Sequence, residues 1–359
     1  MGIWYLFAIS LLCLSMEFCY GCLVERENSI RSVSKLNKRF AFVIFFILAF
    51  LTMFRDVRVG NDTDVYVWVF TNVCNGIKEG EFLRFEFGYQ QLNLLLAVFF
   101  QKPQAILIAT ALICYGLVGL HMIKYVDNKL LYIIVFYCLL FSHYTNIIRQ
   151  AIALCILIFA YEYCCRRKYW ATVLLTLLAM SFHYAAIVFL AYVILKNVKL
   201  TKKSAFFLFF IAVVFSLFAD RFLLKWFIKI VPSYAYYLTG ERVGTGQLGT
   251  TLNLLIVVIL FLLYYLPRKK QKIPNEILWL FLLCGGITAL SYIMNNFTRA
   301  AYVFYLPIIK ECCTYPPVYK KKNGLIEVLI VGGLLLIFTL IIIFRPGWNN
   351  LYPYSFYSA

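Results

Sequence analysis

Residues 105–122 read AILIATALICYGLVGLHM, and residues 325–344 read LIEVLIVGGLLLIFTLIIIF. Each stretch comes close to the roughly 20 apolar residues that an α-helix needs to cross the hydrocarbon of a membrane. Further apolar blocks occupy residues 206–219, 252–266 and 277–294, and short groups of Lys and Arg separate them. We therefore predict an all-α, polytopic integral membrane protein with about 10–12 transmembrane or re-entrant helices.

The composition supports this class over a soluble one. The chain is 63% hydrophobic and 14% charged, whereas about a quarter of the residues of a soluble domain are charged. The net charge of +18 is explained by basic residues in short cytoplasmic loops, so we expect no nucleic-acid partner. The prediction is one membrane domain over residues 1–359, with outer-face segments near 55–90 and 220–249.

The basic residues predict the orientation of the helices. They recur at residues 26–39, 124–129, 166–168, 196–203, 268–272 and 320–322. If all these clusters are cytoplasmic, both termini and the remaining polar segments lie outside. Residues 169–195 and 277–309 then form helical hairpins. Residues 92–100 are too short for a full crossing and are expected to be re-entrant or partly inserted.

The first polar segment reads RDVRVGNDTDVY and spans residues 55–66. Gly60 and Asn61 suit a tight turn, and Asp62 or Thr63 is expected to cap the helix that follows. Asp62 and Tyr66 would share one face of that helix. The simpler interpretation is a solvated loop with local Arg–Asp pairs.

Two other short motifs flank apolar segments. Residues 86–89 read EFGY and residues 181–184 read SFHY. The functional interpretation makes Glu86 and His183 site residues. The simpler interpretations are the start of a helix with an interfacial aromatic residue, and a structural histidine. A single His cannot make a metal site, and we expect neither a metal nor a cofactor.

The fourth polar group is His143 with the sequence NIIRQ at residues 146–150. On a helix, Asn146, Arg149 and Gln150 lie on one face, because they are spaced i, i+3 and i+4. A strongly apolar run follows, so Arg149 is expected at the edge of a membrane helix. It either extends to the interface or lines a polar pocket, and the sequence leaves both interpretations open.

Arginine suits phosphate binding because its planar guanidinium donates two parallel hydrogen bonds and stays charged. The predicted topology places Arg55, Arg149 and Arg299 on one side of the membrane, where they are candidates to hold a lipid-linked pyrophosphate. Nearby carboxylates are candidates to activate an acceptor hydroxyl.

These motifs, in this order, resemble the EpsG family of exopolysaccharide biosynthesis proteins, which are related in role to Wzy polymerases. The resemblance runs from about Phe40 to Pro307. Its matching pieces are Arg55, the sequence GNDTD at 60–64, Tyr66, Glu86 with Gly88 and Tyr89, Asn146 with Ile148, Arg149, Gln150 and Ala153, Phe182 with His183, and Arg299.

The resemblance implies a polymerase that joins oligosaccharide repeat units carried on undecaprenyl pyrophosphate. It would work at the outer face of a bacterial cytoplasmic (inner) membrane, as a multi-pass protein that makes an exopolysaccharide, capsule or O-antigen. Membrane lipid, a flippase and a chain-length regulator are the implied partners.

The resemblance also implies roles for individual residues. Arg149 and Arg299 would hold the donor pyrophosphate, and Arg55 would assist. Asp62 or Asp64 would activate the acceptor hydroxyl, with His183 as an alternative base. The other residues expected to bind substrate are Tyr66, Glu86, Tyr89, Asn146 and Gln150.

Three other functions remain open. An O-antigen ligase or another lipid-donor glycosyltransferase would use the same arginine chemistry. A transporter or flippase would need polar residues near mid-membrane and often shows repeated halves, and neither is clear in the sequence. A membrane acyltransferase would need a catalytic His near an acid, and His183 has no acidic neighbour in the sequence.

Overall fold

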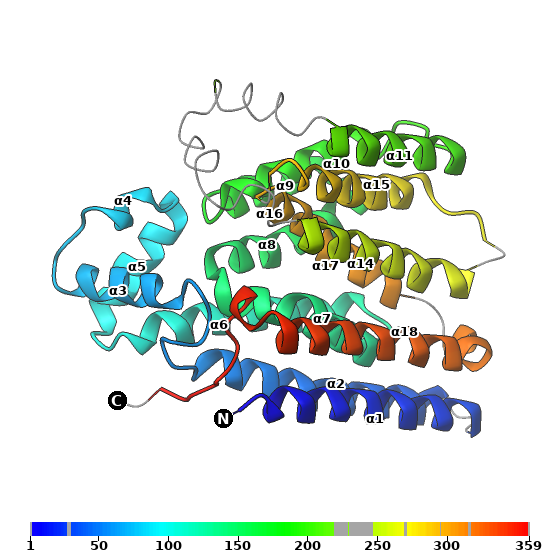
Figure 1. The fold of residues 1–359 in the computed structure, drawn as a ribbon, viewed down its shortest axis with the longest axis horizontal. Helices are drawn as coiled ribbons and strands as arrows, with labels where there is room; N and C mark the ends of the chain where they lie inside the picture. The colour runs from blue at the N-terminus through cyan, green and yellow to red at the C-terminus, as the bar shows by residue number, and fades with distance from the viewer. Residues whose placement is uncertain are drawn as a thin grey trace.

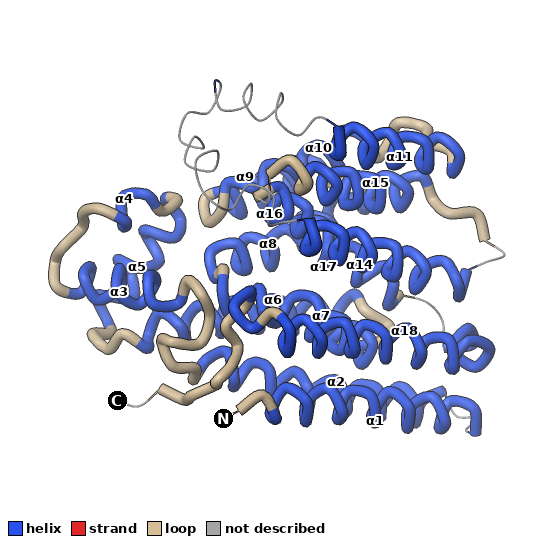
Figure 2. The backbone as a smooth tube through the Cα atoms, in the orientation of Figure 1, coloured by secondary structure: helices blue, strands red, loops and turns tan. Residues whose placement is uncertain are grey.

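The computed structural model describes residues 2–26, 30–218, 229, 247–268, 271–294, 296–314 and 317–357. Across these residues the chain is helical without a sheet (Figure 2). One isolated β-bridge joins Arg55 to Phe356. Six of the described helices are long and apolar enough to cross a membrane. The predicted all-α, multi-pass architecture is confirmed. The predicted outer segment 220–249 lies almost entirely outside the described residues, as do residues 269, 270 and 295.

Six long helices contain the candidate membrane spans. They are α1 (Trp4–Arg26), α2 (Ile30–Met53), α6 (Gln104–Tyr125), α8 (Ile148–Cys165), α14 (Gln247–Tyr265) and α18 (Pro317–Phe344). Shorter helices complete the bundle: α7 (Lys129–Asn146), α9 (Tyr169–Met180), η1 (Tyr184–Val188), α10 (Phe189–Leu195), α11 (Lys202–Phe218), η3 (Leu266–Arg268), α15 (Asn275–Leu290), α16 (Phe297–Ala301), η4 (Tyr302–Phe304) and α17 (Tyr305–Cys313). The segments 169–195 and 277–309 are therefore helical hairpins, as predicted.

The chain reverses at two opposite ends of the bundle (Figure 1). At the right-hand end in this view, α1 turns into α2, α6 into α7, α14 into α15 and α17 into α18. The predicted basic clusters 26–39, 124–129, 268–272 and 320–322 lie at or beside these reversals in the sequence, and we call this end the basic end. Asn128 of the α6–α7 turn joins three elements there, because it accepts a hydrogen bond from Asn37 at 2.8 Å and donates one to Glu327 at 3.0 Å.

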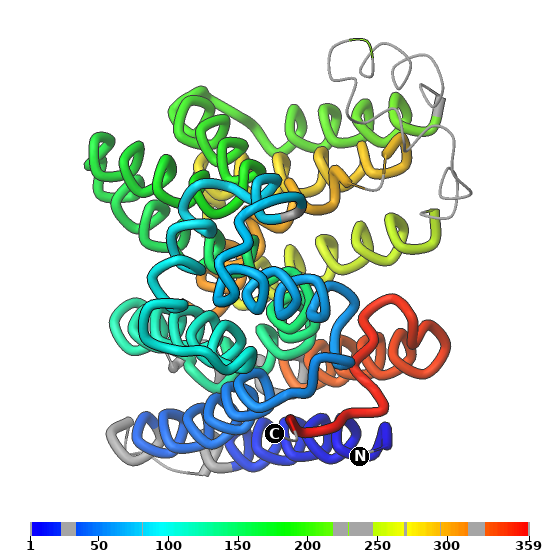
Figure 3. Tube along the Cα trace, turned by 90° about the vertical axis from the view of Figure 1, so that its left-hand side faces the viewer, coloured from blue at the N-terminus to red at the C-terminus, as the bar shows by residue number. Residues whose placement is uncertain are grey.

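Three helices lie at the opposite end, beside both chain termini (Figure 1). They are α3 (Thr63–Cys74), α4 (Glu81–Arg84) and α5 (Phe87–Phe99). Figure 3 looks onto this end and shows them lying over the middle of the bundle. We call it the site end. The segment 92–100 thus belongs to α5, which lies beside the bundle end and does not pass through it.

Helix α7 forms the centre of the bundle. Its residues from Leu130 to Phe141 are all buried, because α2, α6, α8, α17 and α18 pack around it. A helix that is apolar on every side is stable only when it is enclosed in this way. His143 and Asn146, the polar residues of its last turn, are therefore held in a fixed position relative to the surrounding helices at the site end.

The turn before α3 is held by the C-terminal tail. Gly60 has a φ of +100°, and a Cβ built there would lie 2.9 Å from the Thr145 carbonyl oxygen, so only glycine fits. Its amide donates to Asn350 O at 2.9 Å, and the Asn61 side chain donates to Trp348 O at 2.9 Å. The tail, which includes η5 (Pro346–Trp348), thus fixes where α3 begins.

Candidate functional site

Three predicted residues from distant parts of the sequence meet at the site end. The Glu86 carboxylate forms an ion pair with Arg149 Nη1 through one oxygen. Its other oxygen accepts a hydrogen bond from His183 Nδ1 at 3.0 Å. We call Glu86, Arg149 and His183 the site cluster. It joins the start of α5, the first turn of α8 and the turn between α9 and η1. Arg149 is therefore paired with a carboxylate, and its side chain is 18% exposed.

A glycine allows this meeting. The Gly88 amide donates to Ser181 O at 2.7 Å, and a Cβ at Gly88 would lie 2.4 Å from the Ser181 hydroxyl oxygen and 2.9 Å from its carbonyl oxygen. A side chain at Gly88 would therefore push α5 away from the α9–η1 turn. Because Glu86 lies two residues before Gly88, this close approach sets the distance between Glu86 and His183.

Aromatic rings form a layer beneath Arg149. Its guanidinium carbon lies 4.6 Å from the ring centre of Phe85 and 5.9 Å from that of Tyr66. Tyr89 packs edge-on against both rings, at 5.2 Å and 5.7 Å between ring centres. Tyr66 and Tyr89, predicted as substrate-binding residues, thus lie buried under the cation, where rings of this kind attract a positive charge.

Charge and burial together set the protonation states of Glu86 and His183. Burial raises the pKa of Glu86, but the hydrogen bond from His183 and the charge of Arg149 outweigh it, so the pKa lies below its ordinary value. Burial and the positive charges of Arg149 and Arg299 lower the pKa of His183, and together they outweigh the effect of Glu86, which raises it. An ionised Glu86 only accepts hydrogen bonds, so His183 Nδ1 carries its proton and Nε2 presents a lone pair.

Several polar atoms around the site cluster have no hydrogen-bond partner among the described residues. They are buried side-chain atoms: Arg149 Nε, His183 Nε2, Gln150 Oε1 and His143 Nε2. Buried polar groups are normally paired, and exceptions in a protein call for an explanation. Unused donors and acceptors close to a partly exposed arginine are what a polar substrate would satisfy.

Arg299 approaches the site through its backbone. Gln150 Nε2 donates to the carbonyl oxygen of Arg299, which ties α16 to the first turn of α8. His143 stacks on Tyr302, with 4.3 Å between ring centres. The Arg299 side chain is partly exposed, and among the described residues it forms no ion pair. It is therefore a second cation available at this end of the bundle.

Two predicted residues of the first polar segment lie in different surroundings. Asp62 is at the N-cap position of α3, but its side chain accepts no capping hydrogen bond. Its charge acts on the buried Tyr66 hydroxyl together with the charges of Arg149 and Arg299. Asp64 is exposed, and one of its oxygens accepts from the amide of the next residue at 2.8 Å.

Asn146 and Arg55 lie further from the site cluster. The Asn146 amide accepts from Asn61 N and donates to Asn349 O at 2.9 Å, so it braces the turn before α3 and the tail. Arg55 is fully buried and donates to Thr52 O. Its surroundings include Tyr89 and Tyr115, and it makes no ion pair within the described chain. The predicted local Arg–Asp pairing holds for Arg58 with Asp56, at 2.7 Å.

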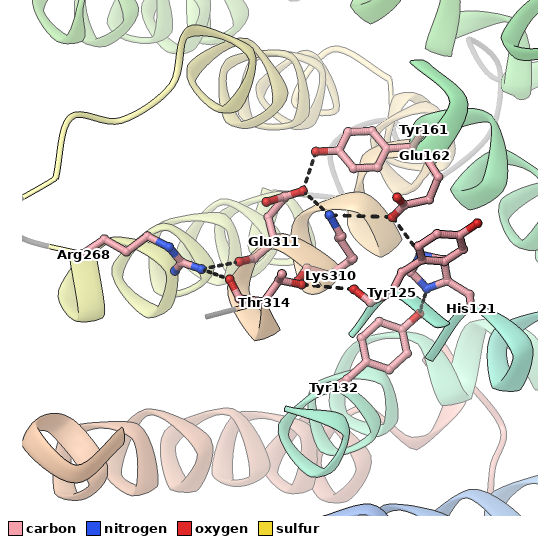
Figure 4. A network of polar contacts seen from close by, with 9 residues as sticks. All are labelled: His121, Tyr125, Tyr132, Tyr161, Glu162, Arg268, Lys310, Glu311 and Thr314. Carbon is pink, nitrogen blue, oxygen red and sulfur yellow. Dashed lines mark hydrogen bonds and ion pairs between the residues drawn. The ribbon is translucent and has the colours of Figure 1, made fainter. Parts of the chain in front are cut away.

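A second group of charged residues lies near the C-terminal ends of α6, α8 and α17, and Figure 4 shows its network of polar contacts. His121 Nε2 is 3.2 Å from Glu162 Oε1, and Lys310 Nζ is 3.7 Å from the same oxygen. Lys310 also pairs with Glu311 at 2.8 Å. We call these four residues the second cluster. They tie α6, α8 and α17 together, and none of their buried side-chain nitrogens and oxygens is without a partner in the described structure.

The second cluster and Phe85 were not identified from the sequence. His121 and Glu162 lie inside apolar segments, where charged residues are rare enough to be noticed, so that signal was present. Lys310 and Glu311 stand near a basic cluster and gave no such signal. Phe85 is one of 34 phenylalanines, and its neighbour Glu86 alone did not distinguish it.

The model of the EpsG family matches residues 38–356 of the chain. This range contains the site cluster, Arg299, the turn at Gly60 and most of the C-terminal tail. No curated protein and no solved structure matches the chain.

Proposed function

The chain belongs to the EpsG family, and on that premise we propose that it is a membrane glycosyltransferase that polymerises lipid-linked oligosaccharide repeat units. The family places it in exopolysaccharide biosynthesis, and the helices make it a multi-pass membrane protein. The observation that carries the proposal is the site cluster. A partly exposed arginine and a carboxylate-bound histidine with a free nitrogen lie together at one end of a membrane bundle.

The proposed reaction is glycosyl transfer from a lipid pyrophosphate donor. A hydroxyl of the acceptor repeat unit attacks the anomeric carbon of the donor, and a new C–O bond forms there. The bond between that carbon and the pyrophosphate oxygen breaks, and its electron pair leaves with the pyrophosphate. The hydroxyl proton passes to a base. The enzyme must therefore stabilise negative charge at one point and accept a proton at another.

Arg149 fits the first requirement. Glu86 engages Nη1, and Nε is left without a partner among the described residues. This unused donor matches an oxygen of a phosphate. Arg299 supplies the second positive charge. Its carbonyl oxygen accepts a hydrogen bond from Gln150, the residue that follows Arg149 in α8. We propose that both arginines hold the donor pyrophosphate.

His183 fits the second requirement better than the aspartates do. Glu86 fixes its tautomer and orientation, so that Nε2 is the proton acceptor. We therefore propose His183 as the base and Glu86 as its positioning residue. Asp62, whose side chain caps no backbone amide of α3, is proposed to orient the acceptor. Asp64 is exposed and accepts a hydrogen bond from the amide of Val65, and we assign it no part in the reaction.

The test is gel analysis of lipid-linked glycans in cells that carry wild type, Arg149→Ala or Arg149→Lys. We expect long polymer to disappear and single repeat units on lipid to accumulate, because lysine cannot donate the two parallel hydrogen bonds of arginine. Arg58→Ala is the matched control, since Arg58 lies at the same end with its side chain 77% exposed. Long polymer in both Arg149 variants, at normal protein levels in the membrane, would refute the assignment.

The Glu86–His183 pair also favours a second candidate, an acyltransferase that modifies sugars. The sequence shows no acid next to His183, but the structure places Glu86 on it. The same experiment separates the two functions. Inactivation of His183 in an acyltransferase would leave polymer of normal length without its acyl groups, whereas in a polymerase it would abolish the polymer.

A further inference from the structure

Helix α5 exposes an apolar stripe. The stripe holds Phe87, Leu95 and Val98, which are 69%, 58% and 74% exposed, together with the polar Gln91. The face turned into the protein holds Tyr89 and Asn93, which are fully buried, and the partly buried Leu96. In water the hydrophobic effect disfavours an exposed stripe of this kind. The medium next to the outer face of α5 must therefore be apolar.

Helix α3, beside it, has a different outer face. Its exposed residues include Asp64 and Trp68, a charged and an amphipathic side chain that fit the level of lipid headgroups. The two neighbouring helices thus indicate two media. The boundary of the membrane passes close to α3, and α5 reaches into the hydrocarbon.

The length of α5 agrees with partial insertion. Its 13 residues span about 20 Å at 1.5 Å per residue, less than the hydrocarbon thickness of about 30 Å. The helix begins directly after Glu86, the carboxylate of the site cluster. One short helix therefore carries an apolar surface along its outer face and a polar site at its start.

We propose that α5 is a lipid-tail guide: its outer stripe contacts the hydrocarbon chain of the donor, so that the anionic headgroup arrives at Arg149 from within the membrane. The charges agree with this arrangement, because Arg149 and Arg299 stand at the end of the stripe where the headgroup would lie. The inference rests on the proposed function for the identity of the donor as a lipid pyrophosphate. It adds the route of entry and the surface that recognises the tail.

The test is photo-crosslinking with an encoded benzoylphenylalanine at Leu95, in phosphatidylethanolamine–phosphatidylglycerol vesicles that contain tail-labelled polyprenyl pyrophosphate. The matched control carries the crosslinker at Asp64, on the outer face of α3. We expect an adduct with the labelled tail at Leu95 and little at Asp64. Excess unlabelled polyprenyl pyrophosphate should suppress the adduct, and Arg149→Ala should weaken it at least several-fold.

Three results would overturn the inference. One is an adduct at Leu95 with phospholipid alone, with no preference for the polyprenyl probe. Another is an adduct between two protein chains, which would make the stripe a protein interface. The third is no adduct in a protein that still polymerises. A specific adduct in a protein without polymerase activity would instead sustain the guide and refute the proposed reaction.

A second measurement introduces a positive charge into the stripe. Leu95→Lys places a cation on the proposed tail contact, whereas Gln91→Lys places one at a position of the same stripe that is already polar. We expect Leu95→Lys to reduce capture of the labelled tail at least tenfold more than Gln91→Lys does, at equal protein in the membrane. Equal capture by the two variants would refute tail recognition by this face.

Discussion

Helix α8 carries a charged cluster near each of its ends, and the two clusters contain the same kinds of groups. The site cluster has a glutamate, a histidine and an arginine, and the second cluster has two glutamates, a histidine and a lysine. Both are largely buried. The difference lies in their unused hydrogen-bonding atoms. Arg149 Nε and His183 Nε2 have no partner among the described residues, whereas the buried atoms of the second cluster are all engaged.

This comparison separates two uses of buried charge. A complete network of ion pairs and hydrogen bonds fixes helices relative to one another, and removal of one member leaves an uncompensated charge. An incomplete network keeps atoms ready for a substrate. We infer that the second cluster holds α6, α8 and α17 in place and that the site cluster carries the chemistry.

The largest expected effect is on catalysis at the site cluster. His183→Ala should lower the polymerisation rate about 10²–10⁴-fold, the usual contribution of a general base, and leave the thermal unfolding temperature nearly unchanged. His121→Gln, a change at the histidine of the second cluster, should leave turnover per folded molecule unaltered. Rates from purified protein and unfolding curves in detergent check both expectations. A strong loss of turnover in folded His121→Gln would contradict the inference that the second cluster is structural and the site cluster catalytic.

The second prediction concerns stability. Glu162→Ala leaves His121 and Lys310 without their shared acceptor and should reduce the free energy of unfolding by about 3–5 kcal/mol, as loss of one partner of a buried ion pair does. The measurement is chemical unfolding in detergent. Glu86→Ala, the same change in the partly open cluster, should destabilise the protein less. Equal destabilisation by the two variants would show that the site cluster is as structural as the second.

The third prediction tests the contact that brings the site cluster together. Gly88→Ala should slow the reaction about 100-fold, the effect expected for a displacement of about 1 Å at a catalytic group. Gly116→Ala is the control, because a Cβ at Gly116 meets nothing within 4 Å. Polymer assays at equal amounts of membrane protein compare the two variants. Normal activity in Gly88→Ala would mean that Glu86 and His183 do not depend on this approach.

The smallest effect is the pH dependence. The pKa of His183 lies below its ordinary value of 6.5, so the base is neutral at pH 7 and becomes protonated only at lower pH. The rate should therefore be flat above pH 6.5 and fall about tenfold per unit below the folded-state pKa. Glu86 stays ionised throughout this range, since its pKa is lowered. A rate that rises on acidification would argue against His183 as the base.

Much of the fold could be predicted from the sequence because it depends on local composition. The block at 105–122 lies within α6, and the one at 325–344 lies within α18. The positions of the lysine and arginine clusters also predicted the places where the chain reverses its direction. Helices α3 to α5 were predicted only as an outer segment with a re-entrant or partly inserted stretch, because the exposed apolar stripe of α5 is recognised only when its buried face is known.

The candidate site was predictable in its members but not in its connections. Polar residues beside apolar runs drew attention to Glu86, Arg149 and His183 one at a time. Their pairing joins residues 63 and 97 positions apart, and no local pattern encodes such a distance. The same reason explains why Glu86 was expected to bind substrate, whereas in the structure both of its oxygens are engaged by the protein.

The hydrogen bonds between the α3 turn and the tail have a consequence for biosynthesis. The Asn61 side chain donates a hydrogen bond to the carbonyl oxygen of Trp348, which is translated 287 residues later. The Asn350 side chain donates one to the carbonyl oxygen of Arg58, which lies 292 residues earlier. A ribosome must therefore deliver the chain as far as Asn350 before the turn at α3 is anchored by the tail. A chain that ends before this tail lacks the contacts that hold the turn before α3, so the site is finished only after the tail has been translated.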